Sequence, residues 1–230
     1  MTALTGMRVV AFTRTGRIIA PVIAVLVIVG TLNGGGQSQV GDAYGLSAAF
    51  LFPVLAWQTK LLLDGEPDVQ RRLARVAVGS ELREQGAGLA AAALAALPLL
   101  AIALTLPWAL NGVTGPENLD DQPLATGLTL GFWAHVILVP AGVALGALAS
   151  RAVTGTTGRG AAVLVAGSVL ALVLGLQSSP VPWIAPPVLE AARIATSGSG
   201  VGDILIASVW ALVWAGLAIF GYSRLRRRRA

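Results

Sequence analysis

Apolar runs alternate with short polar stretches along the entire chain. The runs cover about residues 18–32, 44–63, 86–110, 125–150, 160–177 and 201–223. Each approaches the roughly 20 apolar residues that a helix needs to cross the hydrocarbon core of a bilayer, although the first and fifth runs are short. The pattern predicts an all-α integral membrane protein with six transmembrane helices.

The basic residues give these predicted spans an orientation. Fifteen of the 16 Lys and Arg residues lie near the chain termini or around the second and fourth connections, whereas the other three connections hold six acidic residues and Arg193. Basic residues beside membrane spans stay on the cytoplasmic side, so we expect both termini to be cytoplasmic. The Ala, Gly, Val, Leu and Arg bias indicates a bacterium, which predicts a multi-pass protein of the bacterial cytoplasmic (inner) membrane.

Composition narrows the function classes. The chain is 55% hydrophobic and only 12% charged, and its formal charge of +5 follows the orientation of the spans, so it indicates contact with membrane lipid and not with nucleic acid. Cysteine is absent and one histidine is present, so we expect no disulfide and no metal site. No P-loop motif and no catalytic constellation occur, and Ser168 lacks a G-x-S-x-G turn, so the chain is predicted to be neither an enzyme nor a cofactor-binding protein.

The two ends of the chain are predicted to lie at the inner surface of the membrane. Residues 1–17 are mildly amphipathic and are interpreted as an interfacial helix, with a cleaved signal peptide as the alternative. Residues 224–230 form a basic tail, which is interpreted as a stop-transfer anchor, with a dedicated lipid-binding role as the alternative.

The connection at residues 64–84 contains a predicted amphipathic helix. Pro67 suits the first turn of this helix, where Glu66 and Asp68 complement the helix dipole. Three apolar residues then recur at helical spacing: Val69, Leu73 and Val76. Three arginines point to another side of this helix: Arg71, Arg72 and Arg75. Gly79 is a predicted helix stop, and Ser80 can cap the helix that leads into the third span.

The external connection at residues 178–200 is interrupted by prolines. Trp183 suits the membrane interface, Pro186 and Pro187 break any helix, and residues 188–196 can form a short one. The segment is apolar but too short to span, so we expect a hairpin that re-enters the membrane or lies on its outer leaflet.

Three internal features have two interpretations each. His135 lies mid-span and is either a pathway residue or a partner in a helix–helix hydrogen bond, and no acidic partner lies in another span interior. The two G-x-x-x-G pairs in the fourth span, which begin at Gly127 and Gly142, let helices approach closely, but they are a weak signal for a dimer. The Gly-rich turn at residues 155–160 is interpreted as an ordinary loop, with phosphate binding as the alternative.

Taken together, these features resemble the membrane subunit of ABC-2-type exporters, and the CcmB-like heme-exporter permeases share the outline. The likeness is carried by FLFPV at residues 50–54, Trp57, DGEPDV at residues 64–69, Arg83 and the Ala/Leu-rich third span. The external segment from Ser179 to Pro187 looks like that of actinobacterial members. The likeness covers nearly the whole chain, but it is architectural.

The resemblance implies a partner that performs the chemistry. The helix after span two would be the coupling helix that seats in a separate ABC ATPase, present in two copies, which binds ATP and Mg. Its contact residues would be Pro67, Asp68, Val69, Arg72, Leu73 and Val76. Two permeases, as a homodimer or heterodimer, would face each other through spans one and five. The cargo would be apolar or amphiphilic, such as a lipid, a peptide antibiotic or a drug, and would move outward.

Two other classes stay open from the sequence. A secondary transporter or channel would be favoured by inverted repeats, but residues 18–110 and 125–223 show no convincing match. A membrane scaffold or immunity protein would need no transport chemistry at all. The three hypotheses differ in whether an ATPase partner is required.

Overall fold

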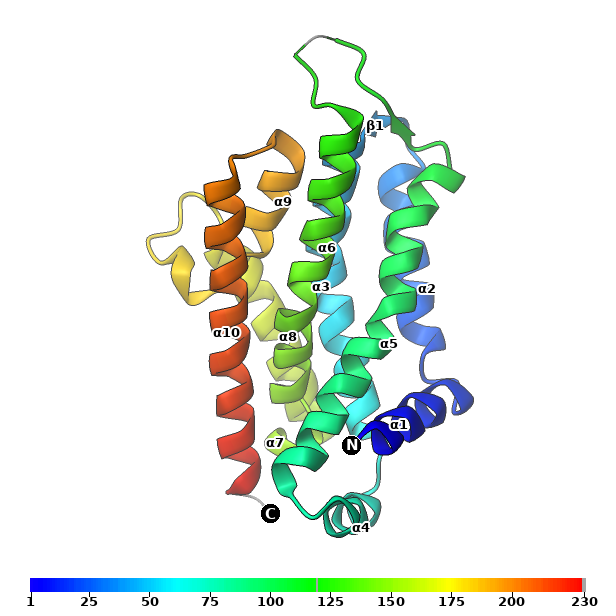
Figure 1. Cartoon of the computed structure of the whole chain (residues 1–230), viewed down its shortest axis with the longest axis vertical. Helices are drawn as coiled ribbons and strands as arrows, with labels where there is room; N and C mark the ends of the chain where they lie inside the picture. The colour runs from blue at the N-terminus through cyan, green and yellow to red at the C-terminus, as the bar shows by residue number, and fades with distance from the viewer. Residues whose placement is uncertain (119, 229–230) are drawn as a thin grey trace.

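The structure is a computed structural model that describes residues 1–118 and 120–228, and its regular structure is almost entirely helical (Figure 1). The helices that run along the long axis are α2 Ile19–Asn33, α3 Val40–Asp64, α5 Glu81–Ala109, α6 Leu124–Leu148, α8 Thr157–Leu174 and α10 Val201–Arg227. The shorter helices are α1 Thr2–Arg14, α4 Asp68–Val78, α7 Arg151–Thr154, α9 Val188–Ser197 and the 3₁₀ helix η1 Pro182–Ile184. The prediction of an all-helical chain is confirmed, and its long apolar helices are consistent with a membrane protein.

The number of six spans stays a prediction, because the structure is compatible with five or six. Within the described residues, five helices are long and apolar enough to cross a membrane: α3, α5, α6 with α7, α8 and α10. The remaining candidate, α2, has 15 residues, which corresponds to about 22 Å against a hydrocarbon core of about 30 Å. It reaches the required length only together with α1, from which it is bent by 71°.

α3 is the central helix of the bundle, and α6 packs closely along it. Phe52, Leu55 and Ala56 of α3 are fully buried. Glycines on α6 permit this approach: a Cβ at Gly142 would lie 2.8 Å from Leu55 Cβ, and one at Gly146 would overlap the carbonyl oxygen of Ala56. The small residues at this G-x-x-x-G spacing are therefore used for packing inside the chain.

The segment at residues 178–200, which was predicted to re-enter the membrane or lie on its outer leaflet, packs into the bundle through α9. α9 contacts α3 and α6, and one face of α9 is buried through Val188, Ala191 and Ala195. The backbone of α9 approaches two glycines on α3, because a Cβ at Gly41 would lie 2.5 Å from Ala195 O and one at Gly45 would lie 2.6 Å from Ala192 O.

A small strand pair, which the helical pattern does not predict, joins two connections at the same end as α9. Strand β1 (Ser38–Gln39) pairs in parallel with β2 (Val113–Thr114), with Ser38 opposite Val113. The pair ties the connection after α2 to the connection after α5.

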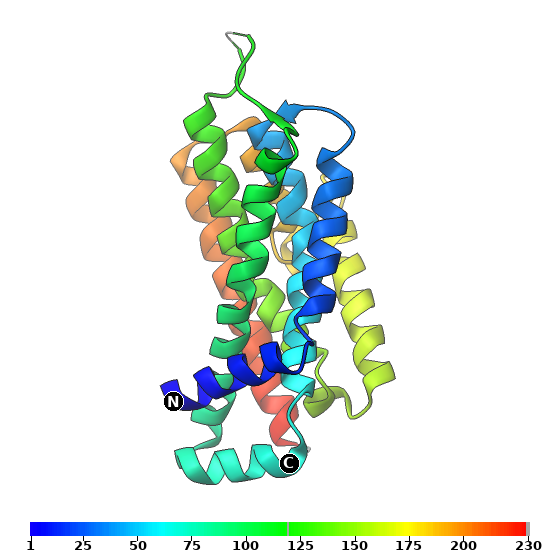
Figure 2. The same cartoon turned by 90° about the vertical axis from the view of Figure 1, so that its right-hand side faces the viewer.

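Both chain ends lie at the other end of the bundle (Figures 1 and 2). α1 lies across this end at a steep angle to α2, and α4 lies beyond α1, farther from the bundle (Figure 2). We call the end that carries α1, α4, α7 and the end of α10 the basic end, because the chain's basic residues concentrate in these segments.

Candidate functional site

α4 is an amphipathic helix with sharply defined ends. It begins at Asp68, one residue after Pro67, whose extended backbone (φ −62°, ψ 150°) caps the helix instead of lying in its first turn. It ends at Gly79, whose φ of 69° is the left-handed conformation that glycine adopts without strain. Ser80 then precedes α5 at the capping position, without a side-chain hydrogen bond.

The apolar ridge of α4, defined as Val69, Leu73 and Val76, is exposed. The exposed fractions of these three residues are 68%, 65% and 80%, and no residue of α4 is buried. An exposed apolar ridge is typical of a surface that docks on another molecule. The structure thus brings together the residues of the predicted coupling helix on one short, projecting element.

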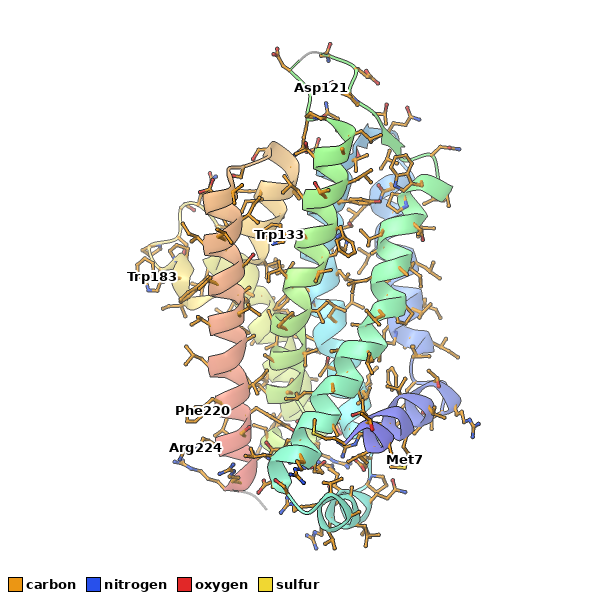
Figure 3. The ribbon with its side chains drawn as sticks, viewed as in Figure 1. Met7, Asp121, Trp133, Trp183, Phe220 and Arg224 are labelled. Carbon is orange, nitrogen blue, oxygen red and sulfur yellow. The ribbon has the colours of Figure 1, made fainter. Side chains whose placement is uncertain are left out.

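A groove separates α4 from α1. It has a volume of about 760 Å³, and Met7 and Phe12 of α1 face Leu73 and Ala77 of α4 across it. Met7 is exposed on α1 at this end of the molecule (Figure 3). α1 itself is fixed to the bundle by its contacts with α5, through the buried side chains of Leu4 and Phe12.

Beneath this groove lies a buried ion cluster, which we define as Arg8, Glu66, Glu84 and Arg226. Arg8 Nη2 is 2.5 Å from both Glu84 Oε1 and Glu66 Oε2, and Arg226 Nη2 is 2.5 Å from Glu84 Oε2. Arg226 also donates a hydrogen bond to the hydroxyl of Tyr222 at 2.9 Å. The side chain of Glu84 is only 1% exposed, and two carboxylates balance two guanidinium groups. The carboxylate of Glu84, on α5, therefore links α5 to both α1 and α10.

The cluster includes one residue of the predicted basic tail at residues 224–230. Arg226 is buried in the cluster, a contact that the interpretation of this tail as a stop-transfer anchor did not include. Arg224 lies 5.0 Å from the ring of Phe220 on the exposed side of α10, and Arg227 and Arg228 are exposed (Figure 3). Arg229, with Ala230 of the tail, lies outside the described residues.

His135 is fully buried between α6 and α3. Its Nδ1 lies 2.8 Å from the carbonyl oxygen of Gly131, and its Nε2 lies 3.1 Å from Ser47 Oγ. The ring of Tyr44 packs edge-on against it at 5.7 Å. These contacts include no carboxylate, so the geometry matches the interpretation as a helix–helix hydrogen bond and offers no proton relay.

The predicted external residues line a second cavity beside the first half of α10. Trp183, Pro186 and Pro187 face Leu205 and Val209 of α10 across about 660 Å³. Trp183 projects outward from this segment and is 58% exposed (Figure 3).

Two other tryptophans hold the external segment in place. Trp210 Nε1 donates a hydrogen bond to Ala185 O at 3.1 Å, and Trp214 Nε1 donates one to Ile184 O at 2.9 Å.

The described residues contain no group of three or more His, Asp or Glu side chains that could hold a metal ion. Comparison with protein-family models, with curated proteins and with solved structures finds no significant match.

Proposed function

We propose that the chain is the permease subunit of an ATP-driven ABC-2-type exporter in the bacterial cytoplasmic membrane. The observation that carries this proposal is α4: an amphipathic helix at the basic end whose apolar ridge is exposed. The positive-inside rule places that end in the cytoplasm. An ATPase subunit, in two copies, would bind the ridge and hydrolyse ATP with Mg.

The contacts around α4 give a route from such a partner to the spans. Glu66, directly before α4, binds Arg8 of α1, and only Gly79 and Ser80 separate α4 from α5. Glu84, in the first turn of α5, then binds Arg226 of α10. A displacement of α4 would therefore be transmitted to three helices at once.

In this proposal α2 serves as the sixth span, and α1 is the interfacial helix beside it. α2 and α8 both contact α3 and both carry exposed apolar side chains, such as Ile23 and Val165. These surfaces would meet lipid and a second permease, identical or not. Because the charged side chains lie toward the helix ends, the cargo would be apolar or amphiphilic, such as a lipid, a peptide antibiotic or a drug, and would move outward.

Co-expression with the neighbouring genes and gentle purification tests the proposal. We expect an ATPase subunit to co-purify in stoichiometric amount, and its hydrolysis to rise in the complex. Leu73→Glu and Val76→Glu should each abolish the association and the stimulated hydrolysis, because they place a charge on the ridge.

Leu82→Glu is the matched control, because Leu82 lies at the same end, is 58% exposed and is outside the ridge. It should leave association intact. A chain that purifies alone under all conditions, or that transports cargo with an ion gradient and no ATPase, would contradict the proposal and favour a secondary transporter.

A further inference from the structure

A second surface of α4 lines an arginine-rich cavity at the basic end. This cavity, which we call the arginine pocket, has a volume of about 500 Å³ and lies between α4, α7 and the end of α10. Its charged lining residues are Arg71, Arg72, Arg75, Arg151, Arg226 and Asp68. Five basic side chains thus converge from three elements that are far apart in the sequence.

The acidic residues nearby do not balance these charges. Asp68 is shared between Arg71 at 2.8 Å and Arg151 at 3.9 Å. Glu81 lies 3.8 Å from Arg75. Glu84, which binds Arg226, is already shared with Arg8 of the buried ion cluster. The pocket therefore has an excess of positive charge.

Several of the arginine donors also lack acceptors. Within the described residues, the Nε atoms of Arg71 and Arg75 are buried and have no hydrogen-bond partner, and Arg72 makes no salt bridge. A buried donor without an acceptor is costly, so the pocket is suited to an acceptor from outside the chain. The planar guanidinium group binds two oxygens of a phosphate at once, and several such groups surround this space.

We propose that the arginine pocket binds a phosphate-bearing anion, either the headgroup of an anionic phospholipid or a free phosphate compound. Gly155, from the Gly-rich turn after α7, also lines the pocket, which gives that turn a place in a site. The site requires no ATPase partner.

The purified chain tests this directly. To measure lipid retention, the chain is placed in nanodiscs of phosphatidylglycerol or phosphatidylcholine and the bound lipid is detected by native mass spectrometry. To measure binding of free phosphate compounds, the chain is titrated with inorganic phosphate or pyrophosphate at constant ionic strength, and its thermal stabilisation is recorded. Arg72→Gln/Arg75→Gln/Arg151→Gln should weaken binding of the active probe by about tenfold or more, which corresponds to the loss of at least one charge-assisted hydrogen bond. The control Arg14→Gln/Arg83→Gln/Arg159→Gln removes the same charge from exposed positions at the same end and should change binding less than about twofold.

The single variant Arg72→Gln tests binding without disturbing the fold, because Arg72 is exposed. It should weaken binding while the melting temperature without anion stays unchanged. If the unmodified chain retains phosphatidylglycerol and the pocket variants lose it, the ligand is a lipid headgroup. If only phosphate or pyrophosphate stabilises the chain, the ligand is a free phosphate compound. If neither probe binds, or if the control triple weakens binding as much as the pocket triple, the proposal is wrong.

Discussion

The two ends of the bundle are held together by different interactions. At the basic end, a buried carboxylate, Glu84, joins three helices through Arg8 and Arg226. At the other end, α9 packs its backbone against glycines of α3, and the Glu190–Arg193 ion pair stays at the surface. The basic end should therefore be sensitive to the loss of a single charge, and the other end to added volume.

The largest effect is expected at the basic end, from Glu84→Gln. The substitution leaves Arg8 and Arg226 buried without their shared carboxylate, which should lower the free energy of unfolding by about 3–5 kcal/mol. Denaturation of the purified protein in detergent measures the change.

Glu190→Gln is the matched control at the other end. The side chains of Glu190 and Arg193 are 48% and 35% exposed, and a surface pair of this kind contributes about 0–1 kcal/mol. Equal losses from the two substitutions would show that the buried ion cluster is not what fixes the basic end.

A smaller effect is expected from Gly45→Ala at the packed end. The new Cβ would lie 2.6 Å from Ala192 O and 2.7 Å from Thr196 Oγ1, so α9 must move away from α3. Overpacking of this kind costs about 1–3 kcal/mol, and thermal unfolding measures it.

Gly216→Ala supplies the reference for that measurement. No atom lies within 4 Å of a Cβ at Gly216, in the middle of α10. The substitution should leave stability unchanged or raise it by up to about 1 kcal/mol. A loss of stability as large as that of Gly45→Ala would mean that the destabilisation comes from replacing a helical glycine by alanine and not from contact with α9.

The smallest effect concerns the exposed connection after β2. The backbone N–H groups of Asn118 and Glu117 donate hydrogen bonds to Asp121 Oδ2 at 2.8 and 2.7 Å and lower the pKa of this carboxyl below its ordinary value. A lowered pKa in the folded state stabilises the turn above the ordinary pKa, and this contribution is lost as the pH falls through the lowered value. Amide exchange at Glu117 and Asn118 should therefore become less protected on acidification, once corrected for intrinsic rates, and Asp121→Asn should abolish that dependence.

Local patterns predicted the elements better than the contacts between them. The apolar periodicity and Gly79 indicated α4 closely, because helix ends depend on the conformations of a few neighbouring residues. Arg226 and Glu84 are 142 residues apart, and each had a sufficient explanation as a charge beside a span. No local rule pairs them.

The packing of α9 was missed for a related reason. The prolines before α9 indicated a broken segment that re-enters the membrane or lies on its outer leaflet, and they do break the chain before Val188. Gly41 and Gly45 stand at the same four-residue spacing as the glycines of the fourth span, and this signal could have predicted a close helix contact on α3. It could not have identified α9 as the partner, since the contact joins segments about 150 residues apart in the sequence.

The buried ion cluster also has a consequence for biosynthesis. Arg8 leaves the ribosome first, Glu66 and Glu84 follow, and Arg226 emerges only after the last span. Until then Arg8 alone faces two carboxylates, so a nascent chain without α10 carries one unbalanced negative charge within the cluster. Arg226 neutralises this charge, so the cluster can close only after α10 has been synthesised.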